Sequence, residues 1–245
     1  STLHCGFDLM ESPARESRYP EGVLDVRRLA RVPYEEGRRL QLELLERRIA
    51  GEVGDTLILC EHESVITLGR GTDPADVAGA NLPIVEVERG GEATYHGPGQ
   101  LVAYPIYALP PARRDLHRYL RDLEEVVIGV LAEVDVEGRR VEGLTGVWIG
   151  DKKVCSIGVA VRRWVAWHGL ALNLAADLAA FAQFKPCGLD ASVMTNVAEH
   201  TSLPPTRLLY EVLLVKHFCA RFELKLPPLP PPAPSDPREL PLFPG

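Results

Sequence analysis

Cys187 is the residue of this chain that is best suited to nucleophilic chemistry. It stands between Pro186 and Gly188, which rarely continue a helix or a strand, so we expect it on a loop. A cysteine attacks as the thiolate, which forms near neutral pH only beside a cation or a helix N-terminus. Without such a partner, a loop cysteine is an inert thiol. Three other cysteines stand in apolar runs and are expected to be small core residues: Cys60, Cys155 and Cys219.

A candidate cation lies at the start of an apolar strand. The chain has only five lysines, and two of them, Lys152 and Lys153, come directly before the apolar residues 154–158. A lysine drawn toward an interior can shift its own pKa or lower that of a neighbouring acid. The alternative is a solvated hairpin end, which we prefer for Lys152 and leave open for Lys153.

Segment 89–100 combines four glycines with polar side chains. Its glycines and Pro98 argue against a regular helix or strand, and glycine lets backbone N–H groups approach a ligand closely. Two interpretations are open: a ligand-binding loop, or a tight structural turn around a core histidine. The segment lacks a Walker lysine and the G-x-G-x-x-G spacing, so a nucleotide loop is not supported.

Cysteine-protease chemistry would need a positioned histidine beside the thiol. His168 and His96 are formal candidates, but no protease signature surrounds Cys187.

The composition excludes several classes of protein. The 245 residues are 46% hydrophobic and 25% charged, which is typical of a globular protein, and the net charge of −7 argues against a dedicated nucleic-acid binder. Five widely spaced cysteines without a C-x-x-C pair argue against disulfides and a structural zinc site, and favour a reducing, cytoplasmic setting. No apolar run is long enough to predict a membrane span, and the first twenty residues resemble neither a secretory signal nor a transit peptide.

Hydrophobic periodicity predicts the elements that must position these residues. Apolar side chains at helical spacing indicate helices at 33–50, at 115–134 and after Pro205. We expect 56–60 and 65–68 to be neighbouring strands and the last three strands to form an antiparallel set. The predicted strands are 23–28, 56–60, 65–68, 84–87, 101–106, 146–149, 154–161 and 167–174.

The chain divides into three predicted regions. Residues 1–21 are polar and are expected to form an irregular N-terminal extension. Residues 22–226 show no linker and are expected to form one catalytic domain of mixed strands and helices. Residues 227–245 are rich in proline and are expected to form an extended C-terminal tail.

Together these segments resemble the lipoyl(octanoyl) transferases, which are octanoyl-[acyl-carrier-protein]:protein N-octanoyltransferases. The resemblance runs from about residue 25 to residue 199. It departs at Cys155, where a small alanine is usual, and at Glu63-Ser64, which replace two prolines. The matching segments are Glu61-His62, 67–70, 89–100, 146–148, 153–158, 168–173 and 186–189.

The resemblance implies a fold and a set of site residues. The fold would be a single α+β domain with a largely antiparallel mixed sheet flanked by helices, as in lipoate and biotin protein ligases. Cys187 would carry the acyl group as a thioester, and Lys153 would lower its pKa and help to move protons. The segments implied to bind substrate comprise Arg89, Gly90, Gly91, Glu92, Ala93, Thr94, Tyr95, His96, Ser156, Ile157, Gly158, Gly169, Leu170 and Ala171.

The resemblance also implies partners. The donor would be octanoyl-acyl carrier protein, and the acceptors would be lysines on lipoyl domains of 2-oxoacid dehydrogenase complexes and of the glycine cleavage H protein, with no cofactor or metal. The alternatives are an ATP-dependent lipoate–protein ligase, or a non-catalytic protein that binds lipoyl domains or acyl carriers. Cys187 between proline and glycine favours the transferase over the ligase, and the presence of both Cys187 and Lys153 argues against a non-catalytic binding protein.

A basic helix face offers a hypothesis about docking. Arg114, Arg118 and Arg121 recur at spacings of four and three on the predicted helix 115–134. They form either a solvated outer face or a docking patch for the acidic protein substrates.

Overall fold

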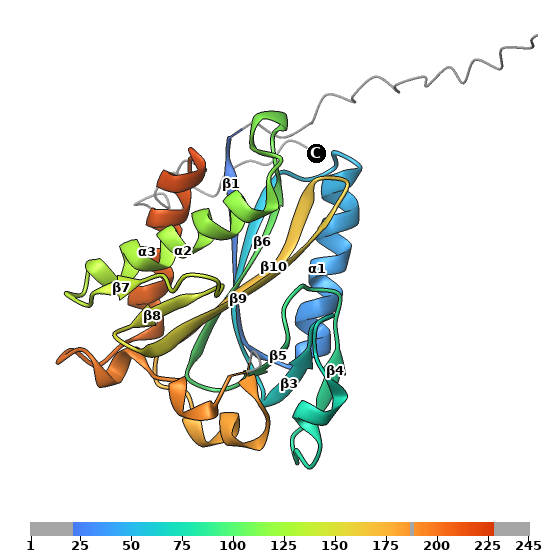
Figure 1. The fold of residues 1–245 in the computed structure, drawn as a ribbon. Coiled ribbons are helices and arrows are strands. Elements are labelled where there is room, and N and C mark those ends of the chain that lie inside the picture. Colours follow the sequence, from blue (N-terminus) through green and yellow to red (C-terminus); the bar gives the residue numbers. More distant parts are fainter. Residues whose placement is uncertain (1–21, 187–188, 228–245) are drawn as a thin grey trace, which may run out of the picture.

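A computed structural model describes residues 22–186 and 189–227 of the chain. Cys187, Gly188, the predicted N-terminal extension and the tail from residue 228 onward lie outside the described residues. The larger of two sheets has the strand order β1-β2-β6-β10-β9-β8-β7, in which β1 and β2 are parallel and the other pairs antiparallel (Figure 1). This confirms the predicted α+β class. The strands are β1 (Leu24–Val32), β2 (Asp55–His62), β6 (Gln100–Ala108), β7 (Gly138–Arg139), β8 (Val147–Ile149), β9 (Lys152–Arg162) and β10 (Val165–Asn173).

Helices cover both faces of this sheet (Figure 1). Helix α1 (Tyr34–Ile49) connects β1 to β2 and buries Leu44 and Leu45 on one face. Helices α2 (Leu116–Ala132) and α3 (Arg207–Phe222) pack side by side on the other face and contribute to the largest core cluster. Helices α1 and α2 agree with the predicted ranges to within about two residues, and α3 begins two residues after Pro205, as predicted.

Helix α2 shows why the sequence folds this way locally. Its N-cap is Asp115, whose carboxylate accepts a hydrogen bond from the Arg118 backbone N–H at 3.1 Å. Its buried stripe, which includes Leu123, Val126, Val127 and Val130, recurs with the helical period and faces the sheet and α3.

The smaller sheet corrects two predictions. It has the order β4-β3-β5, with β4 (Ile84–Glu86), β3 (Val65–Leu68) and β5 (Ala93–His96). The prediction that 56–60 and 65–68 are neighbouring strands is wrong, because β2 pairs with β1 and β6 while β3 lies in the other sheet. The expectation that 89–100 contains no regular strand is also wrong. Residues 93–96 lack glycine and pair antiparallel with β3.

The hairpin turns depend on left-handed backbone. Arg163 and Trp164 connect β9 to β10 with φ of 49° and 61°, and Gly150, with φ of 54°, begins the turn between β8 and β9. The segment after β10 contains the short 3₁₀ helices Leu178–Gln183, Ala191–Val193 and Val197–Glu199. Within the described ranges, no helix is long and apolar enough to cross a membrane.

The packing of α2 makes a first prediction. Leu123→Ala should lower the free energy of unfolding by about 2–5 kcal/mol, because it leaves a cavity between α2 and the sheet. Leu116→Ala on the same helix should change it by less than about 1 kcal/mol, because Leu116 is 42% exposed. Urea denaturation of both variants measures the difference, and equal losses would contradict this account of the core.

Candidate functional site

A cavity of about 260 Å³ lies against β9 and β10, with β5 and a loop before β8 also forming its wall. Most of the residues expected to be catalytic or to bind substrate line it, although they come from segments up to 82 positions apart, from residue 89 to residue 171. The expected residues that line it are Arg89, Gly91, Glu92, Thr94, His96, Lys153, Ser156, Ile157, Gly158, Gly169, Leu170 and Ala171.

Three of the expected binding residues do not line the cavity. Side chains alternate along β5, so Thr94 and His96 face the cavity while Ala93 and Tyr95 pack into a separate core cluster. The Tyr95 ring lies 5.3 Å from that of Phe181, measured between centroids. Gly90 has a structural role instead: its backbone N–H donates to the Val159 carbonyl of β9 at 2.9 Å.

Paired glycines on β9 and β10 let other segments approach the sheet closely. Gly158 and Gly169 stand opposite each other in the ladder. A Cβ on Gly158 would lie 3.0 Å from the Gly90 carbonyl oxygen, and one on Gly169 would lie 2.1 Å from that of Ala103. Any larger side chain at either position would therefore push apart the segments that form the cavity.

Arg89 holds the glycine-rich segment together. Its guanidinium is buried and donates to the Thr67 carbonyl and hydroxyl oxygens, both at 2.9 Å, and to the Glu92 carbonyl at 2.8 Å. These bonds attach the segment 89–92 to β3, so Arg89 shapes the cavity wall to which it also contributes.

Lys153 brings a buried positive charge to the cavity. Its side chain is 3% exposed, and its ammonium lies 5.1 Å from the centroid of the Trp148 ring. Its backbone carbonyl accepts from the Thr195 N–H at 3.0 Å, which holds β9 against the segment after Leu189. Lys152 instead is exposed and donates to the Ser192 carbonyl, as expected for a hairpin end.

Two tyrosines form a part of the site that the sequence analysis did not identify, and they surround histidines that it did. Tyr34 and Tyr104 line the cavity, and the Tyr34 ring stacks on His96 with centroids 5.9 Å apart. His62 Nδ1 donates to the Val32 carbonyl at 3.0 Å, so its Nε2 accepts from the Tyr104 hydroxyl at 2.7 Å. Burial lowers the pKa of His62 to about 4 and that of His96 well below its usual value. Both imidazoles are therefore neutral at pH 7.

His168 lies on the cavity wall with left-handed backbone, at φ +58°. The backbone N–H of His168 donates to Gln41 Oε1 at 3.0 Å, and burial lowers the pKa of the His168 imidazole to about 3. Two buried polar atoms on this wall, Glu92 Oε2 and Thr94 Oγ1, have no hydrogen-bond partner among the described residues, whereas His168 Nε2 lies 3.7 Å from Glu88 Oε2. Buried polar atoms are normally satisfied, so the Glu92 and Thr94 atoms point to polar groups inside the cavity.

The described thiols are poor nucleophiles. Burial raises the pKa of Cys60 to about 12, raises that of Cys155 even further, and raises that of the half-buried Cys219. Cys187 lies outside the described residues. Leu189, two residues beyond it, lines the cavity.

The neutral histidines predict a loss of stability in mild acid. The pKa of His62 is about 6.5 in an unfolded chain and about 4 in the folded protein, so the unfolded state takes up its proton first as the pH falls. Stability should therefore decrease from pH 6.5 toward pH 4, by about 1.4 kcal/mol per pH unit for this residue. In urea titrations across this range His62→Gln should reduce that slope, whereas His117→Gln, an exposed control on α2, should not. The same slope in both variants would show that His62 is not buried as a neutral group.

Comparisons with known proteins agree with this geometry. The lipoyl protein ligase A/B catalytic domain matches residues 33–219. The octanoyltransferase of Syntrophotalea carbinolica is 41% identical over 204 residues, which cover 83% of this chain and 97% of the relative. The octanoyltransferase of Gloeobacter violaceus is 50% identical over 165 residues, 66% of this chain and 74% of the relative.

A solved structure extends the likeness to the fold. A bipartite lipoate protein ligase from Thermoplasma acidophilum superimposes with a TM-score of 0.66 at 18% sequence identity, covering 85% of this chain and 86% of that one. The family match and the sequence identity lead to one assignment: the chain belongs to the lipoyl protein ligase A/B catalytic-domain family and, within it, to the octanoyltransferases.

Proposed function

We propose that the chain moves an octanoyl group from acyl carrier protein to the ε-amine of a lysine on a lipoyl domain, through a thioester on Cys187. The observation that carries the proposal is the buried Lys153 ammonium on the wall of a partly apolar cavity. The octanoyl-acyl carrier protein donor, the acceptor lipoyl domains and the cytoplasmic setting are parts of this proposal.

The surroundings of Lys153 support an anionic partner in the cavity. A desolvated charge is unfavourable unless another group compensates for it. No ion pair within the described ranges 22–186 and 189–227 includes Lys153, and the Trp148 ring supplies only a cation–π contact. A thiolate or the developing oxyanion of a thioester would complete the pairing.

Cys187 is proposed as the nucleophile from its sequence and from its described neighbours. Leu189 lines the same cavity as Lys153, and the chain distance from residue 187 to residue 189 is at most about 7 Å. The buried thiols of Cys60 and Cys155 have raised pKa values and do not compete.

The proposed reaction balances without a cofactor. The Cys187 thiolate attacks the thioester carbonyl of the donor, a new carbon–sulfur bond forms, and the carrier leaves as its thiolate. The neutral acceptor amine then attacks the acyl-enzyme, an amide bond forms, the bond to Cys187 breaks, and the proton lost by the amine passes to the departing Cys187 sulfur. Covalent catalysis in this way divides one transfer between two proteins into two docking events.

The cavity wall suits an acyl group with a polar end. Ile157, Leu170 and Ala171 give it an apolar surface. Glu92 and Thr94 each bring a buried polar atom that lacks a hydrogen-bond partner within the described residues. We propose that the octanoyl chain lies on the apolar surface and that polar groups of the donor meet these atoms.

The basic face of α2 is a weaker docking candidate than its sequence suggests. Arg121 pairs with the buried Glu124, and Arg114 stacks over the Trp164 ring at 5.4 Å. The hypothesis of a docking patch for acidic partners now depends mainly on Arg118, which is exposed.

The nucleophile is tested with octanoyl-acyl carrier protein and an apo lipoyl domain, with and without ATP. The wild-type protein should transfer without ATP, and Cys187→Ala should abolish both transfer and any hydroxylamine-sensitive acyl adduct seen by intact mass. Cys155→Ala is the matched control and should retain both, because that thiol is buried. Full activity in Cys187→Ala, or a strict requirement for ATP, would replace the transferase with the ligase alternative.

The role of Lys153 is tested by alkylation. If its ammonium stabilises the Cys187 thiolate, Lys153→Ala should move the iodoacetamide reaction of Cys187 to higher pH, by about one unit or more. Lys152→Ala, the exposed neighbour, should leave the profile in place. Identical profiles for the wild type and Lys153→Ala would show that this lysine does not set the thiol pKa.

A further inference from the structure

The loop formed by residues 140–146 connects β7 to β8 and forms one wall of the cavity through Gly143, Leu144 and Thr145. Leu144 belongs to none of the core clusters among the described residues, and Gly143 is exposed. The loop therefore lacks an apolar anchor of its own. Polar contacts at its two ends must define its position.

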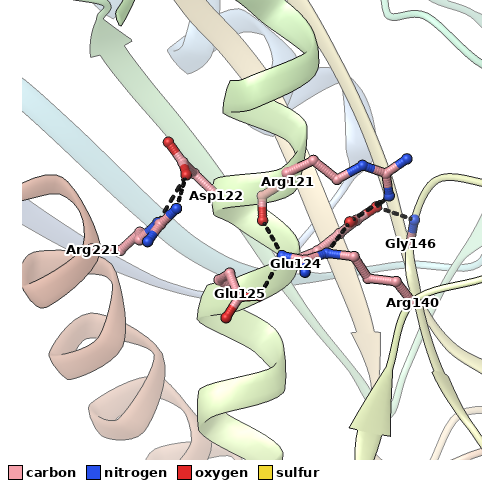
Figure 2. Close-up of polar contacts among 7 residues, drawn as sticks. All are labelled: Arg121, Asp122, Glu124, Glu125, Arg140, Gly146 and Arg221. Atoms are coloured by element: carbon pink, nitrogen blue, oxygen red, sulfur yellow. Dashed lines mark hydrogen bonds and ion pairs between the residues drawn. The ribbon is translucent and has the colours of Figure 1, made fainter.

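Both ends of this loop are bound to one buried carboxylate (Figure 2). Glu124, on α2, has a fully buried side chain. Its Oε2 accepts from Arg140 Nε at 2.8 Å, and its Oε1 accepts from the Gly146 backbone N–H at 3.0 Å. Arg121 pairs with the same carboxylate at 2.7 Å. Two arginines and one N–H thus compensate for the charge of Glu124, which is the arrangement that a buried carboxylate needs.

Arg140 fastens the first end of the loop to α2 at further points. Its guanidinium donates to the Arg121 carbonyl at 3.0 Å and pairs with Glu125 (Figure 2). The guanidinium therefore spans one turn of the helix, and its orientation is fixed in the plane of these bonds.

The second end of the loop touches Lys153. A Cβ built on Gly146 would lie 2.8 Å from Lys153 Cε and 3.5 Å from its Nζ. Two residues further on, Trp148 presents its ring to the same ammonium. The hydrogen bond from Gly146 to Glu124 therefore fixes the backbone that packs on Lys153.

We propose that Glu124 is a positioning residue: by binding both ends of loop 140–146, it holds one wall of the acyl cavity and the surroundings of Lys153. It touches no substrate itself. The inference rests on the proposed function where it concerns the acyl donor. The attachment of the loop stands independently of that function.

The helix provides a matched control for this proposal. Asp122 is another buried carboxylate of α2 paired with an arginine, but its partner is Arg221 of α3, at 2.8 Å from Nε (Figure 2). Loss of Asp122 should weaken the packing of α2 on α3 and leave the loop in place.

The test compares Glu124→Gln with Asp122→Asn in the full chain. Hydrogen exchange followed by mass spectrometry should show at least tenfold faster exchange in peptides from 140–149 for Glu124→Gln alone. The KM for the octanoyl donor should rise at least fivefold, with a smaller change in kcat, because the wall binds the acyl group without entering the chemistry. Asp122→Asn should change neither the exchange rate nor the KM, even if it lowers the melting temperature as much as Glu124→Gln does.

Arg140→Ala replaces Glu124→Gln in this test if the latter fails to fold, because it releases only the first end of the loop. It should change exchange and KM in the same direction by smaller factors. Unchanged exchange in 140–149, or an equal rise of KM in Asp122→Asn, would overturn the proposal. If the wild type transfers no octanoyl group, the proposed function fails, and the exchange experiment still decides whether Glu124 holds the loop.

Discussion

An ammonium group loses most of its hydration on burial, and the loss amounts to several kcal/mol unless other groups compensate for it. Lys153 is in this situation, at 3% exposure on the wall of the cavity. Its neighbours are arranged accordingly: Trp148 offers its ring, Gly146 leaves room for the side chain, and the Thr195 N–H binds its carbonyl. These contacts hold the lysine without neutralising it. The charge therefore remains available to an anion that enters from the cavity.

Helix α2 connects this site to the rest of the core. Residues two positions apart point to different sides of a helix, so Asp122 and Glu124 serve different neighbours. Asp122 binds Arg221 of α3 and thus joins two helices over the sheet. Glu124 binds Arg140 and Gly146 and thus joins the helix to the cavity wall. Both carboxylates are buried, and each is compensated by arginine, so one helix contributes separately to the stability of the fold and to the shape of the site.

The elements of this fold were largely predictable because its helices and most strands have regular apolar periods. The pairing of the strands was harder to predict. β2 and β3 are separated only by Glu63 and Ser64, yet they belong to different sheets, and no local pattern records that change. β5 was missed because glycines flank it on both sides, although Thr94 and Tyr95 favour a strand. Family resemblance identified Lys153 and the cavity segments. Glu124 was missed because its partners, Arg140 and Gly146, lie 16 and 22 residues away, and the helical period showed only Arg121 on an outer face.

The fold alone does not distinguish acyl transfer from an ATP-dependent ligase reaction, because a lipoate protein ligase shares it. A buried lysine does not distinguish them either, since an ammonium can compensate for a phosphate as well as for a thiolate. The cavity wall carries charges of both signs, because Arg89 and Lys153 line it together with Glu92. Its electrostatics alone therefore suit a phosphate as well as an oxyanion. Sequence identity is more informative: relatives that are 41% and 50% identical to this chain are octanoyltransferases, whereas the ligase that shares the fold is 18% identical. The assignment to the transferases thus rests on sequence, and the fold supplies the cavity in which either reaction could take place.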